Sequence, residues 1–443
     1  MNYYSTNGKA PIATLEKAVV KGLAEDRGLY MPEHIKQLPQ EFFDHIQDMT
    51  FQEVAFEVAS AFFGDDIPAA DLRRIVDDTL QFDCPIVPVK DNIYALELFH
   101  GPTLAFKDVG ARFMARLLQY YVKRKATTPG SVNVLVATSG DTGSAVANGF
   151  LGVEGIHVYV LYPKGKVSPI QECQFTTLGQ NITAIEVDGV FDDCQRLVKS
   201  AFMDEELNSH LRLTSANSIN VARFLPQAFY YFWAYAQLKR KATASLDEKG
   251  EVTICVPSGN FGNICAGLFA KRMGLPVSHF IAANNANSVF YEYLQTGQYQ
   301  PRPSVQTIAN AMDVGDPSNF ARIYDLYGKS HDAIAADISG TTYSDAEIAE
   351  TIRQTYAETG YLCDPHGACG LRALESQLQP GHVGIFLETA HPAKFRDTVE
   401  PIIGTTIDIP ARLAAFMQGT KQSVPMSKDF ADFKEYLKLK IEN

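Results

Sequence analysis

A lysine among small and apolar residues is the first group in this sequence that could do covalent chemistry. Lys107 lies in LFHGPTLAFKDVGARF, residues 98–113, and Asp108 follows it directly. An apolar repeat of helical spacing begins at Val109, so we expect the lysine at the start of a helix. A lysine in such a place either covers apolar surface with its stem or supplies an amine that a reaction needs. The other motifs of the chain bear on this choice.

Two glycine-rich loops offer binding sites for anions. TSGDTGSA, residues 138–145, and SGNFGN, residues 258–263, each follow a short β-branched run and precede an apolar-periodic segment. Such a loop either presents backbone N–H groups to a phosphate or carboxylate at a helix N-terminus, or is a tight turn only. The patterns G-x-G-x-x-G and G-x-x-x-x-G-K-[ST] are absent, which disfavours a nucleotide. A lysine with two anion-binding loops indicates pyridoxal phosphate as cofactor.

Composition limits the class of protein. The chain has 443 residues, of which 46% are hydrophobic, and a net charge of -12. This length predicts two or three domains, and the negative charge argues against nucleic acid as a partner. Seven cysteines without a C-x-x-C pair argue against a structural zinc site or a disulfide framework. Because we find no membrane-spanning run and no signal peptide, we expect a cytoplasmic protein. We expect no bound metal, because no motif has metal-ligand spacing.

Strands alternate with helices along most of the chain. Residues 132–152 and 252–274 each read as a β-branched strand, a glycine loop and a helix, and residues 383–395 form a shorter unit with a Pro-containing turn. Short, fully apolar strands separated by helices predict parallel sheets that are covered on both faces. The predicted fold class is therefore α/β, with two α/β domains around a cofactor cleft and a mainly helical N-terminal cap. The predicted domains are residues 1–90 (the cap), 91–250 (with Lys107 and the first loop) and 251–443 (with the second loop and the C-terminal helices).

Several long motifs resemble those of one family. The motifs are GPTLAFKDVGARF, ATSGDTGSAV, PSGNFGN, NSINVAR and ETAHPAKF, together with the N-terminal YYSTNGKAPIATLEKAVVKGLAEDRGLYMPE. They look like threonine synthases of the longer bacterial and fungal branch, which are fold type II pyridoxal-phosphate enzymes. The resemblance extends from the first residues to about Lys394. It implies that O-phospho-L-homoserine and water are converted to L-threonine and phosphate, by γ-elimination and then β-addition, as the last step of threonine biosynthesis.

The resemblance also implies roles for single residues. Lys107 is the Schiff-base lysine and the mobile acid and base, and Thr389 faces the pyridine nitrogen. The residues implied to hold the cofactor phosphate are Gly259, Asn260, Phe261, Gly262 and Asn263. The residues implied to hold the substrate carboxylate are Ser139, Gly140, Asp141, Thr142 and Gly143. Many fold type II relatives have asparagine where this chain has Asp141, at the cofactor's 3-oxygen, and two anionic oxygens there repel unless one is protonated.

The substrate phosphate needs cations and donors of its own. Ser218, Asn220 and Arg223 in NSINVAR combine a hydroxyl, an amide and a guanidinium, which suits a phosphate. Lys164 and Lys166 in YPKGKVSP are further candidates, with a solvated basic loop as the equal alternative.

Other interpretations stay open at this point. The chain could be a related pyridoxal-phosphate-dependent lyase that eliminates phosphate from a phospho-amino acid without adding water. It could also be a non-catalytic protein that binds pyridoxal phosphate or phosphate. DPHGACG, residues 364–370, lacks metal-ligand spacing and is expected to form a turn and a helix start, with Pro365 near the first helical position. The sequence does not decide between a monomer and a homodimer.

Overall fold

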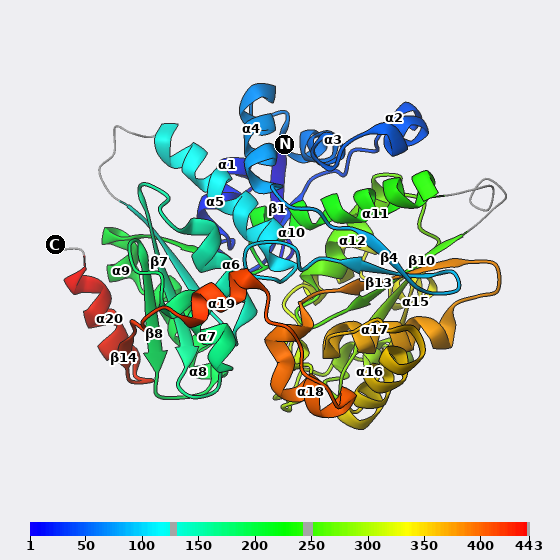
Figure 1. Cartoon of the computed structure of the whole chain (residues 1–443). Coiled ribbons are helices and arrows are strands. Elements are labelled where there is room, and N and C mark those ends of the chain that lie inside the picture. Colours follow the sequence, from blue (N-terminus) through cyan, green and yellow to red (C-terminus); the bar gives the residue numbers. More distant parts are fainter. Residues whose placement is uncertain (125–130, 242–250, 441–443) are drawn as a thin grey trace. The chain divides into compact units, whose positions relative to one another are not determined.

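The computed structural model describes residues 1–124, 131–241 and 251–440 (Figure 1). Its contacts divide the chain into two compact units, each built from segments that are distant in sequence. Unit 1 comprises Met1, Met31–Phe106 and Phe224–Asp408, and unit 2 comprises Asn2–Tyr30, Lys107–Arg223 and Ile409–Asn443. Strand β3 (Tyr30–Pro32) and helix α10 (Val221–Phe224) lie where the chain passes from one unit to the other. The three consecutive domains expected from the sequence stay a prediction, and the compact units follow a different division.

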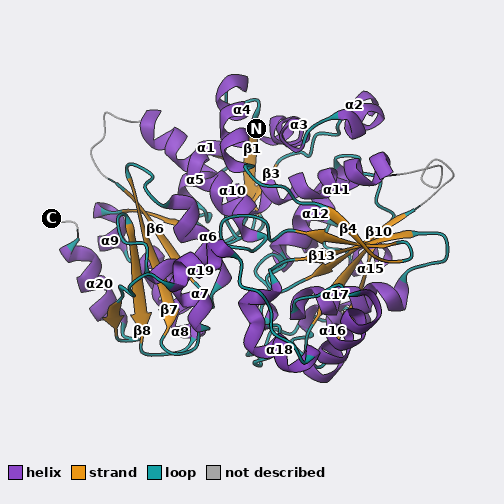
Figure 2. Ribbon diagram, in the orientation of Figure 1, coloured by secondary structure: helices purple, strands orange, loops and turns teal. Residues whose placement is uncertain are grey.

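A six-stranded sheet forms the centre of unit 1 (Figure 2). The strand order is β12-β11-β10-β13-β5-β4, and all neighbours are parallel except β4 and β5. The strands are β4 (Ile86–Lys90), β5 (Ile93–Glu97), β10 (Val252–Pro257), β11 (His279–Asn284), β12 (Ile338–Thr342) and β13 (Val383–Glu388). Every residue of β10 is buried, as expected for a parallel strand covered on both faces.

Helices cover both faces of this sheet. Helix α17 lies against β10, β11 and β13 with α16 behind it, and α11 and α12 lie on the opposite side (Figure 1). The helices of unit 1 are α2 (Gln40–His45), α3 (Phe51–Phe63), α4 (Ala69–Thr79), α11 (Ala228–Lys241), α12 (Gly262–Arg272), α13 (Val289–Thr296), α14 (Phe320–Leu326), α15 (His331–Asp337), α16 (Asp345–Thr359), α17 (Pro365–Gln377) and α18 (Arg396–Ile403). Short 3-10 turns are η1 (Ile46–Asp48), η2 (Leu225–Gln227), η3 (Asn310–Met312) and η4 (Pro392–Phe395).

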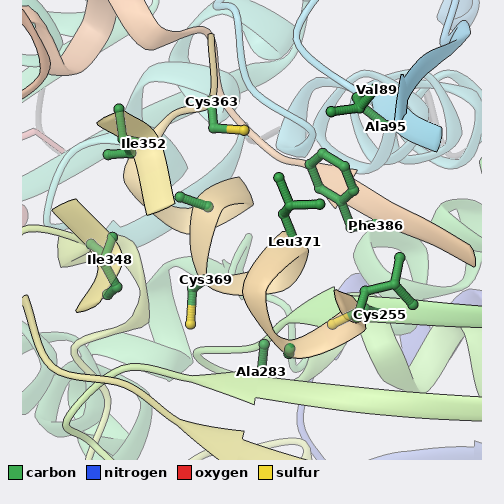
Figure 3. Close-up of a cluster of buried hydrophobic side chains, with 14 of the residues drawn as sticks. Val89, Ala95, Cys255, Ala283, Ile348, Ile352, Cys363, Cys369, Leu371 and Phe386 are labelled. Carbon is green, nitrogen blue, oxygen red and sulfur yellow. The ribbon is translucent and has the colours of Figure 1, made fainter. Parts of the chain in front are cut away.

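An apolar core fills the space between α16, α17 and the sheet. Figure 3 shows Leu371 of α17 beside Phe386 of β13, with Ile352 of α16 and Cys255 of β10 in the same cluster. All seven cysteines are free thiols, and six of them are buried. They serve here as small apolar side chains.

Unit 2 contains a five-stranded parallel sheet in the order β14-β8-β7-β6-β9. Its strands are β6 (Val132–Ala137), β7 (Ile156–Pro163), β8 (Ile182–Val187), β9 (Arg212–Ser215) and β14 (Val424–Met426). A separate antiparallel pair joins β1 (Asn2–Ser5) to β2 (Ala13–Thr14). The helices are α1 (Leu15–Lys21), α5 (Lys107–Arg124), α6 (Asp141–Phe150), α7 (Pro169–Thr176), α8 (Phe191–Met203), α9 (Glu205–His210), α19 (Ala411–Met417) and α20 (Phe430–Leu439). The predicted α/β class with parallel sheets is confirmed.

Local sequence signals explain several helix ends. Thr50 and Glu53 form a capping box at the start of α3, and Asp364 caps α17 with Pro365 in its first turn. The expected turn and helix start at DPHGACG is therefore confirmed. The aromatic run at residues 229–238 lies within α11, most of which is buried. Within the described residues, no helix has both the length and the apolar character that crossing a bilayer requires.

The carboxylate of Asp26 stabilises the N-terminal segment of unit 2 through hydrogen bonds. Asp26 accepts hydrogen bonds from Ser5 Oγ at 2.6 Å and from the N–H groups of Lys9, Ala10 and Gly28 at 2.9 Å. Burial raises the pKa of Asp26, but these hydrogen bonds outweigh it and lower the pKa to about 2. The ionised side chain therefore stabilises this segment.

We expect Asp26→Ala to lower the free energy of unfolding by about 2 kcal/mol at pH 7, because several donors lose a charged acceptor. The loss is measured by urea unfolding followed by circular dichroism. The contribution of Asp26 is full above the unfolded pKa of about 3.9 and disappears as the pH falls through the folded value of about 2. Asp91→Ala, at an exposed aspartate between β4 and β5, is the control and should change stability by less than about 0.5 kcal/mol. Equal losses in the two variants would contradict this role of Asp26.

Candidate functional site

Three predicted segments of unit 2 lie at one edge of its sheet. Strand β6 pairs in parallel with β7 on one side and with β9 on the other. The predicted residues follow these strands directly: Ser139 to Gly143 come after β6, Lys164 after β7, and Ser218, Asn220 and Arg223 after β9. Because the carboxyl ends of neighbouring parallel strands share an edge, the structure brings these three loops together.

The predicted residues of unit 1 lie at the carboxyl edge of the other sheet. The loop Gly259–Asn263 follows β10, and Thr389 follows β13. These strands are parallel neighbours with Cys255 opposite Phe386, so the loop and Thr389 leave the sheet side by side. Thr389 is 6% exposed.

The chain segment before Lys107 is bonded to the segment that begins with Thr389. Phe106 N–H donates to the Thr389 carbonyl at 2.8 Å, and Ala105 and Ala390 form an antiparallel bridge. Further along, Lys394 Nζ donates to the carbonyl of Thr103 at 2.9 Å. Lys107 is the next residue after Phe106 and the first of α5, and it is half-buried. Chain connectivity alone therefore holds the lysine backbone one residue away from a fixed contact with Thr389.

The start of α12 has the features of an anion site. Phe261 precedes the helix in the left-handed conformation, with a φ of 64°, and makes no side-chain cap. The first turn carries no acidic residue, so nothing in it opposes an anion at the positive end of the helix. Asn263 tightens the turn, because its Nδ2 donates to the Pro257 carbonyl at 2.9 Å and its Oδ1 accepts from Ile264 N–H at 2.9 Å. This donor set fits the phosphate of pyridoxal phosphate.

Asn260 is hydrogen-bonded to Ser318 and Asn319. Its Oδ1 accepts from Ser318 N–H at 2.7 Å, and its carbonyl accepts from Asn319 Nδ2 at 3.1 Å. Arg322 in turn donates from Nη1 to Asn319 Oδ1 at 2.7 Å, with its Cζ 4.1 Å from the Phe224 ring centroid. Burial lowers the pKa of Arg322 to about 10, so the guanidinium stays charged at neutral pH. A buried positive charge thus lies two hydrogen bonds away from the glycine loop.

Thr138 organises the glycine loop at the start of α6. Its Oγ1 accepts from the N–H groups of Gly140 at 2.9 Å and Gly143 at 2.8 Å. These two N–H groups are therefore already hydrogen-bonded within the loop, whereas the side chains of Ser139 and Thr142 are half-exposed. Gly140 has a φ of 146°, and a Cβ there would lie 2.6 Å from the Gln171 side chain. Only glycine suits this position.

Asp141 is buried beside an amide from α7. Gln171 Nε2 donates to Asp141 Oδ1 at 3.0 Å, and the aspartate is 5% exposed. Asp141 is also the first residue of α6, where the helix dipole favours a carboxylate. The two glycine loops therefore differ, since an acidic side chain already occupies the start of α6.

The NSINVAR segment contains one exposed and two buried polar side chains. Ser218 is half-exposed. Asn220 is fully buried, with Nδ2 donating to the carbonyls of Val19 at 2.9 Å and Ser215 at 3.2 Å, and with Oδ1 accepting from Ala222 N–H at 2.9 Å. These bonds make Asn220 a brace for the local backbone.

Arg223 is buried at the end of this segment. It is 2% exposed, and Nη1 donates to the Ala216 carbonyl. Burial lowers its pKa to about 10, while the charge of Asp108 opposes that shift. Lys164 and Lys166, by contrast, lie exposed in the loop after β7.

Some residues around these loops carry no motif and were missed from the sequence. Gln171 of α7 and Asn319, the cap residue before α14, lie far along the chain from the residues that they contact. Thr138 could have been identified, because a threonine before a glycine turn commonly accepts from the second N–H after it.

Family comparisons cover the described segments from end to end. Residues 83–387 match the family described as pyridoxal-phosphate dependent enzyme. Residues 2–80 match the threonine synthase N terminus, and residues 367–437 match the threonine synthase C-terminal family. A threonine synthase from Haemophilus influenzae is 43% identical over 437 residues, which cover 99% of each chain.

Solved structures agree with these matches. The threonine synthase structure from Escherichia coli has a TM-score of 0.91 at 40% identity, over 99% of this chain and 100% of that one. The pyridoxal-phosphate-bound threonine synthase structure from Brucella melitensis has a TM-score of 0.92 at 36% identity, over 100% of both chains. This chain therefore belongs to the threonine synthase family of pyridoxal-phosphate-dependent enzymes.

Proposed function

We propose that this chain converts O-phospho-L-homoserine and water to L-threonine and phosphate, by γ-elimination of phosphate and β-addition of water. Pyridoxal 5′-phosphate is its cofactor, as the family and the bound structure from Brucella melitensis indicate. The observation that carries the proposal is the backbone contact between Phe106 and Thr389, because Lys107 is the next residue after Phe106 and Thr389 is the residue proposed to face the pyridine nitrogen. The compartment, predicted to be the cytoplasm, and the choice between monomer and homodimer stay open to experiment.

The proposed cofactor contacts come from the loop before α12 and from Thr389. The N–H groups of residues 259–263 are proposed to hold the cofactor phosphate, since the helix start is uncapped and lacks an acidic side chain. The Thr389 hydroxyl is proposed to hydrogen-bond to the pyridine nitrogen without adding charge. When bound, the cofactor supplies an electron sink for negative charge on the substrate carbons.

Lys107 is proposed to move the protons. Its Nζ takes the proton from the substrate Cα and then transfers protons at Cβ. A lysine suits this task because desolvation lowers the pKa of an amine, so that it can be neutral when it must accept a proton.

The proposed substrate contacts come from the three loops of unit 2. Ser139, Thr142 and the backbone of Asp141 are the better candidates for the substrate carboxylate, because Thr138 already holds the N–H groups of Gly140 and Gly143.

For the substrate phosphate, Ser218 offers a half-exposed hydroxyl and Arg223 a buried charge close by, with Asn220 holding their backbone. Lys164 remains a candidate from an exposed loop, where a solvated role is the alternative.

Product analysis tests the function directly. Incubation of the purified protein with O-phospho-L-homoserine and pyridoxal phosphate should give L-threonine and phosphate in a 1:1 ratio, measured by amino-acid chromatography and a phosphate assay. Phosphate accompanied by a 2-keto acid would identify a lyase that does not add water. Absence of any product would identify a binding protein.

Lys107→Ala should reduce threonine formation about 10³-fold and remove the visible absorption of the bound cofactor, because the variant lacks the amine. Lys107→Arg should fail equally, since a guanidinium does not lose its proton in proteins. Lys123→Ala, at an exposed lysine of the same helix, serves as the control and should keep wild-type turnover. An active Lys107→Ala enzyme without added amine would refute the role of Lys107.

Thr389→Ser should keep most of the activity, whereas Thr389→Asp should still bind the cofactor but lose threonine formation. A carboxylate beside the pyridine nitrogen favours its protonated form, which changes how charge is shared with the substrate carbons. Turnover and the absorption spectrum of the bound cofactor are the two measurements. Thr405→Asp, at an exposed threonine of the same unit, is the control. Wild-type turnover with an unchanged spectrum in Thr389→Asp would place the pyridine nitrogen elsewhere.

A further inference from the structure

The DPHGACG motif forms a buried hydrogen-bonded system at the start of α17. Asp364 Oδ1 accepts from Gly367 N–H at 2.6 Å, and its Oδ2 accepts from His366 Nδ1 at 3.0 Å. Asp364 is fully buried and His366 is 1% exposed. Capping the helix requires only the first of these contacts, so the histidine contact needs another explanation.

His366 uses its second nitrogen to hold a neighbouring turn. Its Nε2 accepts a hydrogen bond from Ala311 N–H at 3.1 Å. Because a backbone N–H can only donate, Nε2 carries no proton, and the ring is neutral with its proton on Nδ1. Asp364 and Ala311 thus fix one tautomer from opposite sides of the ring.

The turn that His366 holds lies against the glycine loop before α12. A Cβ on Gly259 would lie 2.6 Å from the Ala311 carbonyl oxygen and 3.0 Å from Met312 Cα. The loop therefore contacts the carbonyl side of Ala311, and His366 contacts its N–H side. This close approach is possible only because residue 259 is a glycine.

The far side of the same turn is fastened by a second polar group. Asp313 accepts from Thr307 Oγ1 at 2.7 Å, from Thr307 N–H at 3.0 Å and from Asn285 Nδ2 at 2.9 Å. Asn285 Nδ2 also donates to the Ala309 carbonyl at 3.2 Å. His366 and Asp313 hold the turn between them.

We propose that His366 is a positioning residue for the cofactor-phosphate loop, acting through the backbone of Ala311 to hold the turn 310–312 against Gly259. This inference rests on the proposed role of that loop in the function above. This role requires no contact between His366 and the cofactor or the substrate. Through this turn, His366 is proposed to determine the orientation of the loop's backbone N–H groups.

The same system reaches the end of strand β13. Asp364 N–H donates to Glu388 Oε1, and Glu388 directly precedes Thr389. Burial and then the charge of Asp364 raise the pKa of Glu388 well above its ordinary value, which favours the protonated carboxyl beside Asp364. His366 therefore belongs to one buried connection between the strand end at Thr389 and the loop at Gly259.

Two amide variants separate the two contacts of the ring. In His366→Asn the shorter amide reaches only the Nδ1 position, so it keeps the contact to Asp364 and leaves Ala311 N–H unpaired. In His366→Gln the amide oxygen reaches the Nε2 position and can still accept from Ala311 N–H. His279→Asn is the matched control, because His279 is a half-buried histidine of the same unit, at the start of β11, and contacts Ser339 Oγ at 2.8 Å.

The measurement is equilibrium dialysis of the full chain with pyridoxal phosphate and, separately, with pyridoxal, which differs only in lacking the phosphate. We expect His366→Asn to bind pyridoxal phosphate about tenfold more weakly, with pyridoxal affinity unchanged. His366→Gln and His279→Asn should stay within about twofold of wild type for both ligands. Unchanged pyridoxal phosphate affinity in His366→Asn, equal losses in the Asn and Gln variants, or equal losses for the two ligands would each overturn the inference.

Two further variants complete the test. If His366→Asn does not fold, Asp313→Asn loosens the same turn from its other side and should show the same loss confined to pyridoxal phosphate. Equal binding of both ligands by folded Asp313→Asn and wild type would then overturn the inference. Gly259→Val tests the loop itself: unchanged pyridoxal phosphate affinity would refute both the loop's proposed role and the inference. A loss in Gly259→Val without a loss in His366→Asn would refute only the inference.

Discussion

The hydrogen bond from Phe106 N–H to the Thr389 carbonyl joins the segment that precedes Lys107 to the segment that follows strand β13. Both partners are backbone atoms, so the contact is set by the register of Ala105 opposite Ala390 and not by any one side chain. Lys107 follows Phe106 without an intervening residue, so chain connectivity places the lysine backbone directly after this contact.

The two glycine loops look alike in sequence but differ electrostatically. The start of α12 has no acidic side chain, and the buried Arg322 lies two hydrogen bonds away. The start of α6 holds Asp141, which Gln171 keeps in place. A doubly charged phosphate is favoured at the first site, whereas the second suits a single carboxylate bound through hydroxyl groups such as those of Ser139 and Thr142. The difference agrees with the proposal that the first loop holds the cofactor phosphate and the second holds the substrate carboxylate.

The features that could be predicted from the sequence are those that depend on residues close together in the chain. The strand–loop–helix units follow from apolar runs and glycines, and the start of α17 follows from Asp364 and Pro365. The partners Gln171 and Asn319 could not be predicted, because they lie 30 and 59 residues away from the residues that they contact. From the sequence, DPHGACG is expected to form a turn and a helix start, because nothing local shows that His366 contacts Ala311, 55 residues earlier. The apolar periodicity of the sequence also does not show that β5 pairs with β13, which lies far along the chain. The sequence therefore predicts domains made of consecutive residues.

The position of β13 inside the sheet of unit 1 has a consequence for synthesis on the ribosome. Strand β13 lies between β10 and β5, although it is the last of the six strands to emerge. Until it does, β12-β11-β10 and β5-β4 are two separate half-sheets, each with an apolar strand edge open to other chains. Strand β13 (Val383–Glu388) is translated nearly three hundred residues after β5. During that time β4 and β5 lack their partner strand and are exposed to wrong pairings. An open strand edge of this kind pairs wrongly less readily when a helix or another protein covers it.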